Sequence, residues 1–371
     1  MKKILFVLLA VSLFACKSNK KEQTELEFGY QEKEIKPETY YSEDVRFTNE
    51  KEGFSLAGTL TLPSSEGVFP AVVLISGSGA QNRNEEIMGH KPFLVLADHL
   101  TRNGIAVLRF DDRGFGESEG YNPDATTENF ADDVEAAVNY LLSRNEIDKT
   151  KIGLIGHSEG GVIAPMLAAK SNDIAFIVLL AGSGIQGKDL LLLQTALISK
   201  AMGASDSAVE QSSAVNKQLY EIVCTVDDSK QREEKATDIL KQYLSEIPTA
   251  LKGDKTDEEL IAGMIKDIKI PWVVYFLRYN PAPTLENVKC PVLALNGSKD
   301  LQVPSQVNLD AIKTALAKGG NKDFTVKEIE GLNHLFQECN TGSPAEYAII
   351  KQTFSPAVLD EISEWILDRV K

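Results

Sequence analysis

The feature that most constrains the fold is an alternation of apolar runs with helix-like stretches. Four runs, "PAVVLISGSG", "IAVLRFDDRG", "KIGLIGHS" and "AFIVLLAGSG", are typical of strands that are buried on both faces. Between them lie "FLVLADHLTRNG", "ENFADDVEAAVNYLLSR" and "EGGVIAPMLAAK", which have the spacing or length of helices. This order predicts an α/β fold, in which a mostly parallel central sheet is flanked by helices on both faces.

Two parts of the chain depart from this alternation of strands and helices: its beginning and a long helix-rich stretch. "VRFTNEKEG" and "FSLAGTLTLP" predict a hairpin with Gly53 in its turn. Residues 185–288 are rich in helix-like segments and contain no comparable strand, and strands return at "PVLALNGSKD" and "FTVKEIEG". We therefore expect a core made of residues 43–184 and 289–371, with residues 185–288 inserted as a helical cap. The alternative is a second domain with its own core, which the return of strands makes less favourable.

The first residues have the pattern of an export signal. Two lysines, an apolar run and "LFAC" predict a signal peptide over residues 1–15, too short to span a membrane comfortably. "LFAC" resembles the lipobox of bacterial lipoproteins, which predicts lipidation of Cys16 and a polar tether over residues 16–42. We expect an exported protein, either a periplasmic or outer-membrane lipoprotein or a secreted one. The alternative is an ordinary signal peptide followed by a coincidental cysteine.

The negative charge argues against binding to nucleic acid or anionic lipid, and the cysteine content argues against a disulfide framework. The net charge is −15, and removal of the signal peptide would make it more negative by taking away two lysines. An acidic protein is repelled by nucleic acid and by anionic lipid, so membrane attachment is expected only through the lipid anchor. Besides Cys16 there are Cys224, Cys290 and Cys339, an odd and widely spaced set that predicts no disulfide framework. The oligomeric state and any single disulfide stay open.

The stretch "IGLIGHSEGGV" places one serine between glycines where a strand is expected to end. Such a match is common by chance, but it is also the form of a nucleophile elbow, a sharp strand-to-helix turn that exposes a serine hydroxyl. Ser158 is the candidate nucleophile. A serine hydroxyl needs a base to take its proton and a carboxylate to orient that base.

The candidate base and acid follow Ser158 in the chain. His334, in "EIEGLNHLFQ", comes just after the last expected strand, and Asp300 follows the strand in "PVLALNGSKD". The carboxyl ends of parallel strands carry the ligand sites of such sheets, and the order Ser, Asp, His is the one found in α/β-hydrolases. Read alone, Asp300 is equally consistent with an aspartate that stabilises its own turn.

The other histidines are weaker candidates for the base. We expect His157 to point away from the nucleophile and His99 to lie on a helix surface, whereas His90, in a polar loop, stays an open alternative.

An oxyanion hole needs two backbone N–H groups. We expect one from Glu159, the residue after the nucleophile, and one from Ser78 in the loop "SGSGAQNRN", whose glycines allow a tight approach to substrate. The charges of "RFDDRGFGES" are interpreted as pairs that fix a loop.

The segments "ISGSGAQNRN", "RFDDRGFGES", "GHSEGG", "NGSKDLQVP" and "GLNHLF" together resemble the α/β-hydrolase superfamily, near serine esterases of the dienelactone-hydrolase-like and prolyl-oligopeptidase-like families. The resemblance implies acyl transfer to water through a covalent acyl-enzyme, without metal or organic cofactor. Because an ester has a better leaving group than an amide, we expect small-molecule substrates that are short-chain carboxylic esters. Ser76 departs from the pattern, because many relatives have histidine there. Two alternatives are a serine peptidase of the aminopeptidase or acyl-peptidase type and an inactive lipoprotein that only binds.

Overall fold

The computed structural model describes residues 39–247 and 252–371, which divide into two compact units. The larger unit contains described residues 39–185 and 281–371, and the smaller contains 186–247 and 252–280. The predicted signal peptide, Cys16 and nearly all of the predicted tether lie outside the described residues. Those predictions therefore stay predictions.

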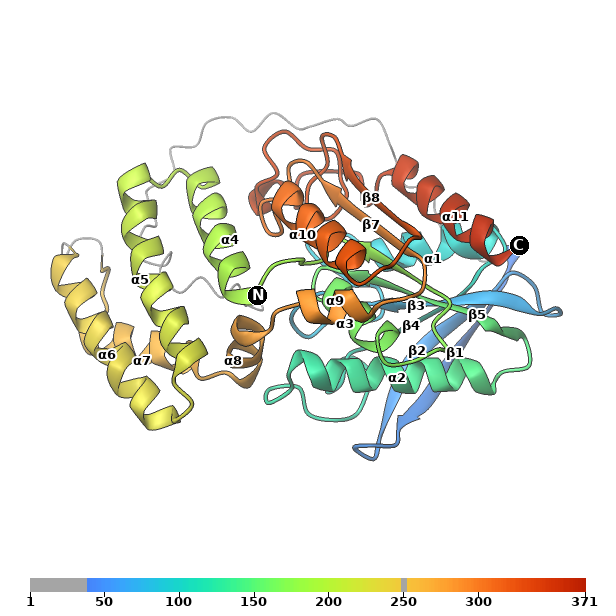
Figure 1. Ribbon diagram of the computed structural model, residues 1–371, viewed down its shortest axis with the longest axis horizontal. Helices are drawn as coiled ribbons and strands as arrows, with labels where there is room; N and C mark the ends of the chain where they lie inside the picture. Colours follow the sequence, from blue (N-terminus) through green and yellow to red (C-terminus); the bar gives the residue numbers. More distant parts are fainter. Residues whose placement is uncertain (1–38, 248–251) are drawn as a thin grey trace. The chain divides into compact units, whose positions relative to one another are not determined.

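The larger unit is built on an eight-stranded sheet, counted over the described residues (Figure 1). Its order is β1-β2-β4-β3-β5-β6-β7-β8, in which β1, β2 and β4 pair antiparallel and all other neighbours pair parallel. This confirms the predicted α/β fold and its opening hairpin. The strands are β1 (Tyr41–Asn49), β2 (Phe54–Leu62), β3 (Phe69–Ile75), β4 (Ala106–Phe110), β5 (Ile147–His157), β6 (Phe176–Leu180), β7 (Val292–Gly297) and β8 (Phe324–Ile329).

Helices cover both faces of the sheet. On one face α1 (Pro92–Arg102) packs beside α11 (Pro356–Val370), and Trp365 meets Phe176 of β6 edge-on at 6.1 Å. On the other face lie α2 (Thr127–Ser143), α3 (Gly160–Ala168), α9 (Ala282–Asn287) and α10 (Ser305–Lys318). Strands β3, β4, β6 and β7 and the second half of β5 are largely buried, which is why their sequences are mostly continuous apolar runs and not alternating ones.

The smaller unit is inserted in the sequence between two strands that are neighbours in the sheet. Strands β6 and β7 are hydrogen-bonded neighbours, with Ile177 opposite Val292, although residues 186–280 separate them along the chain. In its described part this unit is helical: α4 (Gly187–Ala201), α5 (Asp206–Thr225), α6 (Ser229–Glu246), α7 (Asp257–Ile268) and α8 (Pro271–Arg278). The acidic run that follows Thr256 is the first turn of α7, as its sequence indicates, whereas α9 (Ala282–Asn287) was not among the expected helices. That this unit acts as a cap stays a prediction.

Two further observations concern membranes and thiols. Over the described residues, no helix combines the length and the apolar character that crossing a bilayer requires. Cys224, Cys290 and Cys339 are free cysteines, so the structure pairs none of these three with another.

Candidate active site

Ser158 occupies a strained turn between β5 and α3. Its φ is +53°, a left-handed conformation that costs a non-glycine residue roughly 1–2 kcal/mol, and its N–H donates to the Leu180 carbonyl at 2.8 Å. The flanking glycines are required by close packing. A Cβ at Gly156 would lie 2.0 Å from the Gly160 oxygen, and a Cβ at Gly160 would lie 2.1 Å from the Ile75 oxygen. The turn is therefore a nucleophile elbow in geometry as well as in sequence.

Asp300 and His334 form a buried pair at the carboxyl edge of the sheet. His334 Nδ1 lies 2.7 Å from Asp300 Oδ2, and both side chains are almost fully buried. Asp300 Oδ1 accepts the N–H groups of Gln302 and Val303, so the same carboxylate stabilises its own turn and orients the histidine. Asp300 therefore makes the contacts that both interpretations require, and its catalytic role stays a prediction. With Nδ1 donating to Asp300, Nε2 is the ring nitrogen that can accept a proton.

Two other histidines have structural partners instead. His90 is buried, with Nδ1 2.9 Å from Thr353 Oγ1 and Nε2 2.8 Å from the Tyr347 carbonyl, so both of its ring nitrogens are occupied. His99 is half-buried between α1 and α11 and bonds to Ser363 at 3.1 Å. The alternative that His90 acts as the base is therefore not supported.

His157 supports the site in a way that the sequence did not indicate. Its ring is buried against the His334 ring, with centroids 4.8 Å apart, and its Nε2 bonds to the His334 carbonyl at 2.9 Å. Its Nδ1 lies 2.9 Å from Glu85 Oε1. None of these contacts is with Ser158, so the expectation that His157 points away from that residue stays a prediction.

The loop after β3 runs beside the nucleophile. A Cβ at Gly77 would lie only 3.1 Å from the Cβ of Ser158. The Gly77 N–H donates to Glu85 at 2.7 Å, and the Gln81 N–H donates to Asp112 at 2.7 Å, so neither amide is available to a substrate. Ser78 N–H makes no hydrogen bond within residues 39–247 and 252–371. Of these three amides it is the one that can act as an oxyanion donor.

Comparison with known families agrees with this geometry. A family model described as serine aminopeptidase, S33, matches residues 91–339, well over half of the chain. The chain belongs to the serine aminopeptidase S33 family. The match includes the elbow, Asp300 and His334, although it begins after the loop that contains Ser78.

Individual relatives of this S33 family member include esterases. Esterase EstD of Thermotoga maritima is 25% identical over 90% of this chain and 69% of its own length. Two solved structures share the fold. The α/β hydrolase GrgF of Penicillium sp. sh18 has a TM-score of 0.53 at 17% identity, covering 89% of this chain and 99% of that one. The Pyrococcus furiosus esterase Pf2001 has a TM-score of 0.51 at 15% sequence identity, covering 90% of this chain and 95% of that one. The chain is a carboxylesterase-like α/β-hydrolase.

Glu159, the residue after the nucleophile, is turned into the protein. It is 3% exposed and stands at the N-terminus of α3, where the helix dipole favours a negative charge. Its Oε1 accepts the Thr127 hydroxyl proton at 2.6 Å, which links α3 to α2. This carboxylate therefore has an internal role that does not require a substrate.

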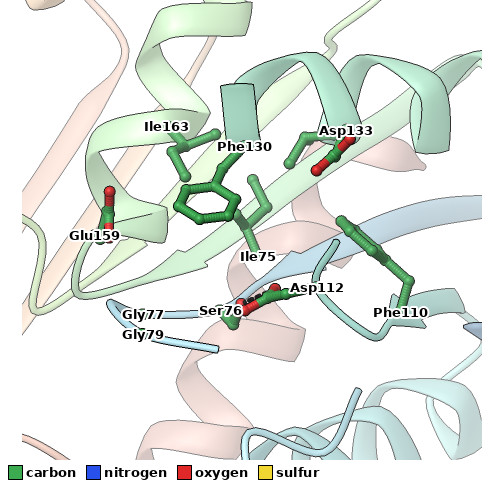
Figure 2. A pocket seen from close by; sticks show the side chains of 11 residues that line it. Ile75, Ser76, Gly77, Gly79, Phe110, Asp112, Phe130, Asp133, Glu159 and Ile163 are labelled. Atoms are coloured by element: carbon green, nitrogen blue, oxygen red, sulfur yellow. Dashed lines mark hydrogen bonds between the residues drawn. The ribbon is translucent and has the colours of Figure 1, made fainter. Parts of the chain in front are cut away.

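A small cavity lies behind the Ser76–Gly79 segment (Figure 2). Its volume is about 20 Å³, room for one water molecule, and its lining includes Asp112, Asp133 and Glu159. Asp112 accepts the Ser76 hydroxyl at 2.8 Å, drawn as a dashed line in Figure 2. Burial raises the pKa of Asp112 to about 8, against the opposing effect of the Gln81 N–H and the Ser76 hydroxyl.

Most of the remaining charges of "RFDDRGFGES" are paired, as expected for a loop held by ion pairs. Arg113, 2% exposed, bonds to Asp133 at 2.7 Å and to Glu52 at 2.8 Å. Asp111 bonds to Arg83 at 2.8 Å. Arg109 differs, because its side-chain bond is to the Asn84 amide oxygen and not to a carboxylate. The pairs connect the segment after β4 to the β1–β2 turn, to α2 and to the loop after β3.

Proposed function

We propose that this enzyme hydrolyses short-chain carboxylic esters through a triad of Ser158, His334 and Asp300. Ser158 Oγ attacks the acyl carbon while His334 Nε2 takes its proton. The N–H groups of Glu159 and Ser78 stabilise the oxyanion. The tetrahedral intermediate then collapses, the alkoxide leaves with the proton from His334, and an acyl-enzyme remains. Water, deprotonated by the same nitrogen, attacks the acyl carbon. The second tetrahedral intermediate collapses, the bond between the acyl carbon and Ser158 Oγ breaks, the carboxylic acid leaves, and Oγ takes the proton back from His334.

One observation carries the proposal: the buried 2.7 Å contact between His334 Nδ1 and Asp300 Oδ2 at the sheet edge that also bears the strained Ser158. A buried carboxylate bonded to Nδ1 fixes the tautomer whose Nε2 is basic, and it stabilises the imidazolium formed during attack. Nothing in a binding module calls for an acid that orients a histidine in this way. The arrangement therefore favours catalysis over binding alone.

The second candidate, an aminopeptidase, is favoured by the description of the family. Such an enzyme must bind a free ammonium with carboxylates that face the nucleophile. Here Glu159 bonds to Thr127 and Asp112 bonds to Ser76, so the buried carboxylates around the nucleophile and its loop have internal partners. In the helical unit, Glu210, Glu221 and Glu246 are exposed. An amide also has a poorer leaving group than an ester, so we favour ester hydrolysis.

The test compares leaving groups on one enzyme. We expect turnover of p-nitrophenyl acetate and butyrate, with kcat/KM for aminoacyl p-nitroanilides at least about a hundredfold lower, or about 2.7 kcal/mol in barrier. Esters of increasing acyl length, with acetylated polysaccharide in parallel, define the acyl preference. Equal kcat/KM for esters and anilides would refute the ester proposal in favour of the peptidase. Ser158→Ala serves as the control for hydrolysis by any other enzyme in the preparation.

We also propose that the enzyme is exported and anchored by lipidated Cys16. Support comes from the sequence alone, through the apolar run that ends in "LFAC" and the polar segment that follows. A lipid anchor would keep an acidic enzyme at a membrane that its surface charge does not attract.

A further inference from the structure

A buried ion pair beside the elbow takes no part in the proposed reaction. His157 Nδ1 lies 2.9 Å from Glu85 Oε1, and its Nε2 lies 2.9 Å from the His334 carbonyl oxygen. The exposed fractions of the two side chains are only 8% for His157 and 5% for Glu85. Glu85 Oε1 also accepts the Gly77 N–H at 2.7 Å. Burying two titratable groups is costly unless they are paired, so their arrangement calls for an explanation.

The partners of His157 determine how its ring is protonated. A main-chain carbonyl can only accept a hydrogen bond, so Nε2 carries a proton. Glu85 Oε1 already accepts the Gly77 N–H at 2.7 Å, and His157 Nδ1 lies 2.9 Å from the same oxygen, so a proton on Nδ1 completes a second hydrogen bond to Glu85. Burial alone lowers the pKa of His157, but the charge and hydrogen bond of Glu85, the His334 carbonyl and the charge of Asp300 together outweigh burial and raise it.

The pair connects the two parts of the site that must be held around Ser158. Through Nε2, His157 holds the main chain of His334, the proposed base. Through Oε1, Glu85 holds Gly77, whose neighbour Ser78 is the proposed oxyanion donor. We infer that Glu85 and His157 form a buried carboxylate–imidazolium pair that positions both the base and the oxyanion loop. This inference rests on the proposed roles of His334 and Ser78, and both members of the pair are positioning residues.

The charge is essential to this arrangement because a neutral imidazole has a single N–H. In Glu85→Gln the amide oxygen can still accept the Gly77 N–H, and the side chain keeps its shape. A neutral His157 that keeps its Nε2–H on the His334 carbonyl can then bond residue 85 only by accepting from the amide NH₂, and in that orientation the Gly77 N–H loses its acceptor. Removing the charge therefore loosens one of the two loops without opening a cavity, which makes Glu85→Gln the informative variant.

The first test observes the pair without substrate. The chain has four histidines, so selective ¹⁵N-histidine labelling gives at most four imidazole spin systems. We expect one of them, assigned through His157→Gln, to keep protons on both ring nitrogens at pH 7.5 in the wild type and on only one in Glu85→Gln. The proton shared by His334 and Asp300 should also shift in Glu85→Gln. It should stay unchanged in Glu86→Gln, the matched control, which removes an exposed carboxylate next in sequence. A wild-type His157 with a single N–H would overturn the inference.

The second test measures the reaction. Glu85→Gln should lower kcat for p-nitrophenyl butyrate by about 10- to 100-fold while KM changes little, because misplacing catalytic groups raises the barrier more than it weakens binding. Labelling of Ser158 by a phosphonate should slow by a similar factor, and Glu86→Gln should match the wild type in both. Unchanged kcat in Glu85→Gln would overturn the positioning role. If the wild type cleaves no ester, the proposed function fails, and the imidazole spectra still decide the state of the pair.

Discussion

Replacing Asp112 by asparagine should change how the stability of the sheet unit depends on pH. Asp112 is buried behind the oxyanion loop, and its pKa is raised from an ordinary value near 3.8 to about 8. In the unfolded chain it ionises above its ordinary pKa, whereas in the native protein it keeps its proton to about pH 8. The native state thus binds more protons over this interval, and the free energy of unfolding falls as pH rises.

The magnitude follows from the size of the shift. Each pH unit between the two pKa values contributes about 1.4 kcal/mol, so the interval from pH 5 to pH 8 accounts for about 4 kcal/mol. Asparagine has no such titration, and its geometry fits: its oxygen can accept the Gln81 N–H, and its NH₂ can donate to a rotated Ser76 hydroxyl. The variant should therefore gain on the wild type by about 1.4 kcal/mol per pH unit across this interval and then level off.

Urea unfolding followed by tryptophan fluorescence measures this difference. A Trp272→Phe background leaves Trp365, which packs against Phe176 in the sheet unit, as the reporter of the unit that contains Asp112. As a companion variant, Ser76→Ala removes a hydrogen bond that lowers the pKa of Asp112, so it should extend the falling region to higher pH. Curves for Asp112→Asn and the wild type that stay parallel from pH 5 to pH 8 would refute the reasoning.

Three further predictions concern other parts of the chain. Ser158→Ala should lower kcat by about 10⁴-fold or more and abolish phosphonate labelling, and near-normal turnover would contradict this expectation. Ser158→Gly should be about 1 kcal/mol more stable than Ser158→Ala, because glycine tolerates the positive φ. Equal stability of the two variants would contradict that expectation. Asp133→Ala should cost about 3–5 kcal/mol in urea unfolding, because buried Arg113 would keep Glu52 as its charged partner and the Asn129 carbonyl as an acceptor but lose its buried carboxylate. A loss below about 1 kcal/mol would mean that the pair is replaceable. Cys16→Ser should move the enzyme from the membrane to the soluble fraction, and unchanged fractionation would contradict the lipid anchor.

The parts that the sequence predicts well are those governed by repeating physical rules. Buried parallel strands need continuous apolar runs, and the carboxyl ends of such strands meet at one edge. These two rules are sufficient to expect Ser158, Asp300 and His334 at that edge, and the structure brings the last two into contact. Helix α9 was missed because it is only six residues long.

The hydrogen bonds that hold the surroundings of these residues join segments far apart in the sequence. Glu85 reaches His157 across 72 residues, and Asp112 reaches Ser76 across 36. Each contact depends on how a loop packs onto the finished sheet, so sequence spacing does not predict it. A local signal was present, however: three carboxylates, Glu85, Asp111 and Asp112, stand in polar loops that follow buried strands. Such residues call for a buried partner whenever the loop is packed, and a search for that partner would have led to His157.

Three residues in or beside this site have a strained backbone that hydrogen bonds to other segments hold in place. Ser158, Glu85 and Phe336 all have positive φ without being glycine, at roughly 1–2 kcal/mol each. Each is held by hydrogen bonds to other segments: Ser158 to Leu180, Glu85 to Gly77 and His157, and Phe336 to the Ser355 N–H. Left-handed residues persist only where their surroundings determine them. Glycine at Glu85 or Phe336 would relieve the strain, but at Glu85 it would also remove the proposed pair. Substitutions that stabilise this region are therefore expected to lower activity, because in the proposed reaction the strained backbone positions the nucleophile and the segments that carry the base and the oxyanion donor.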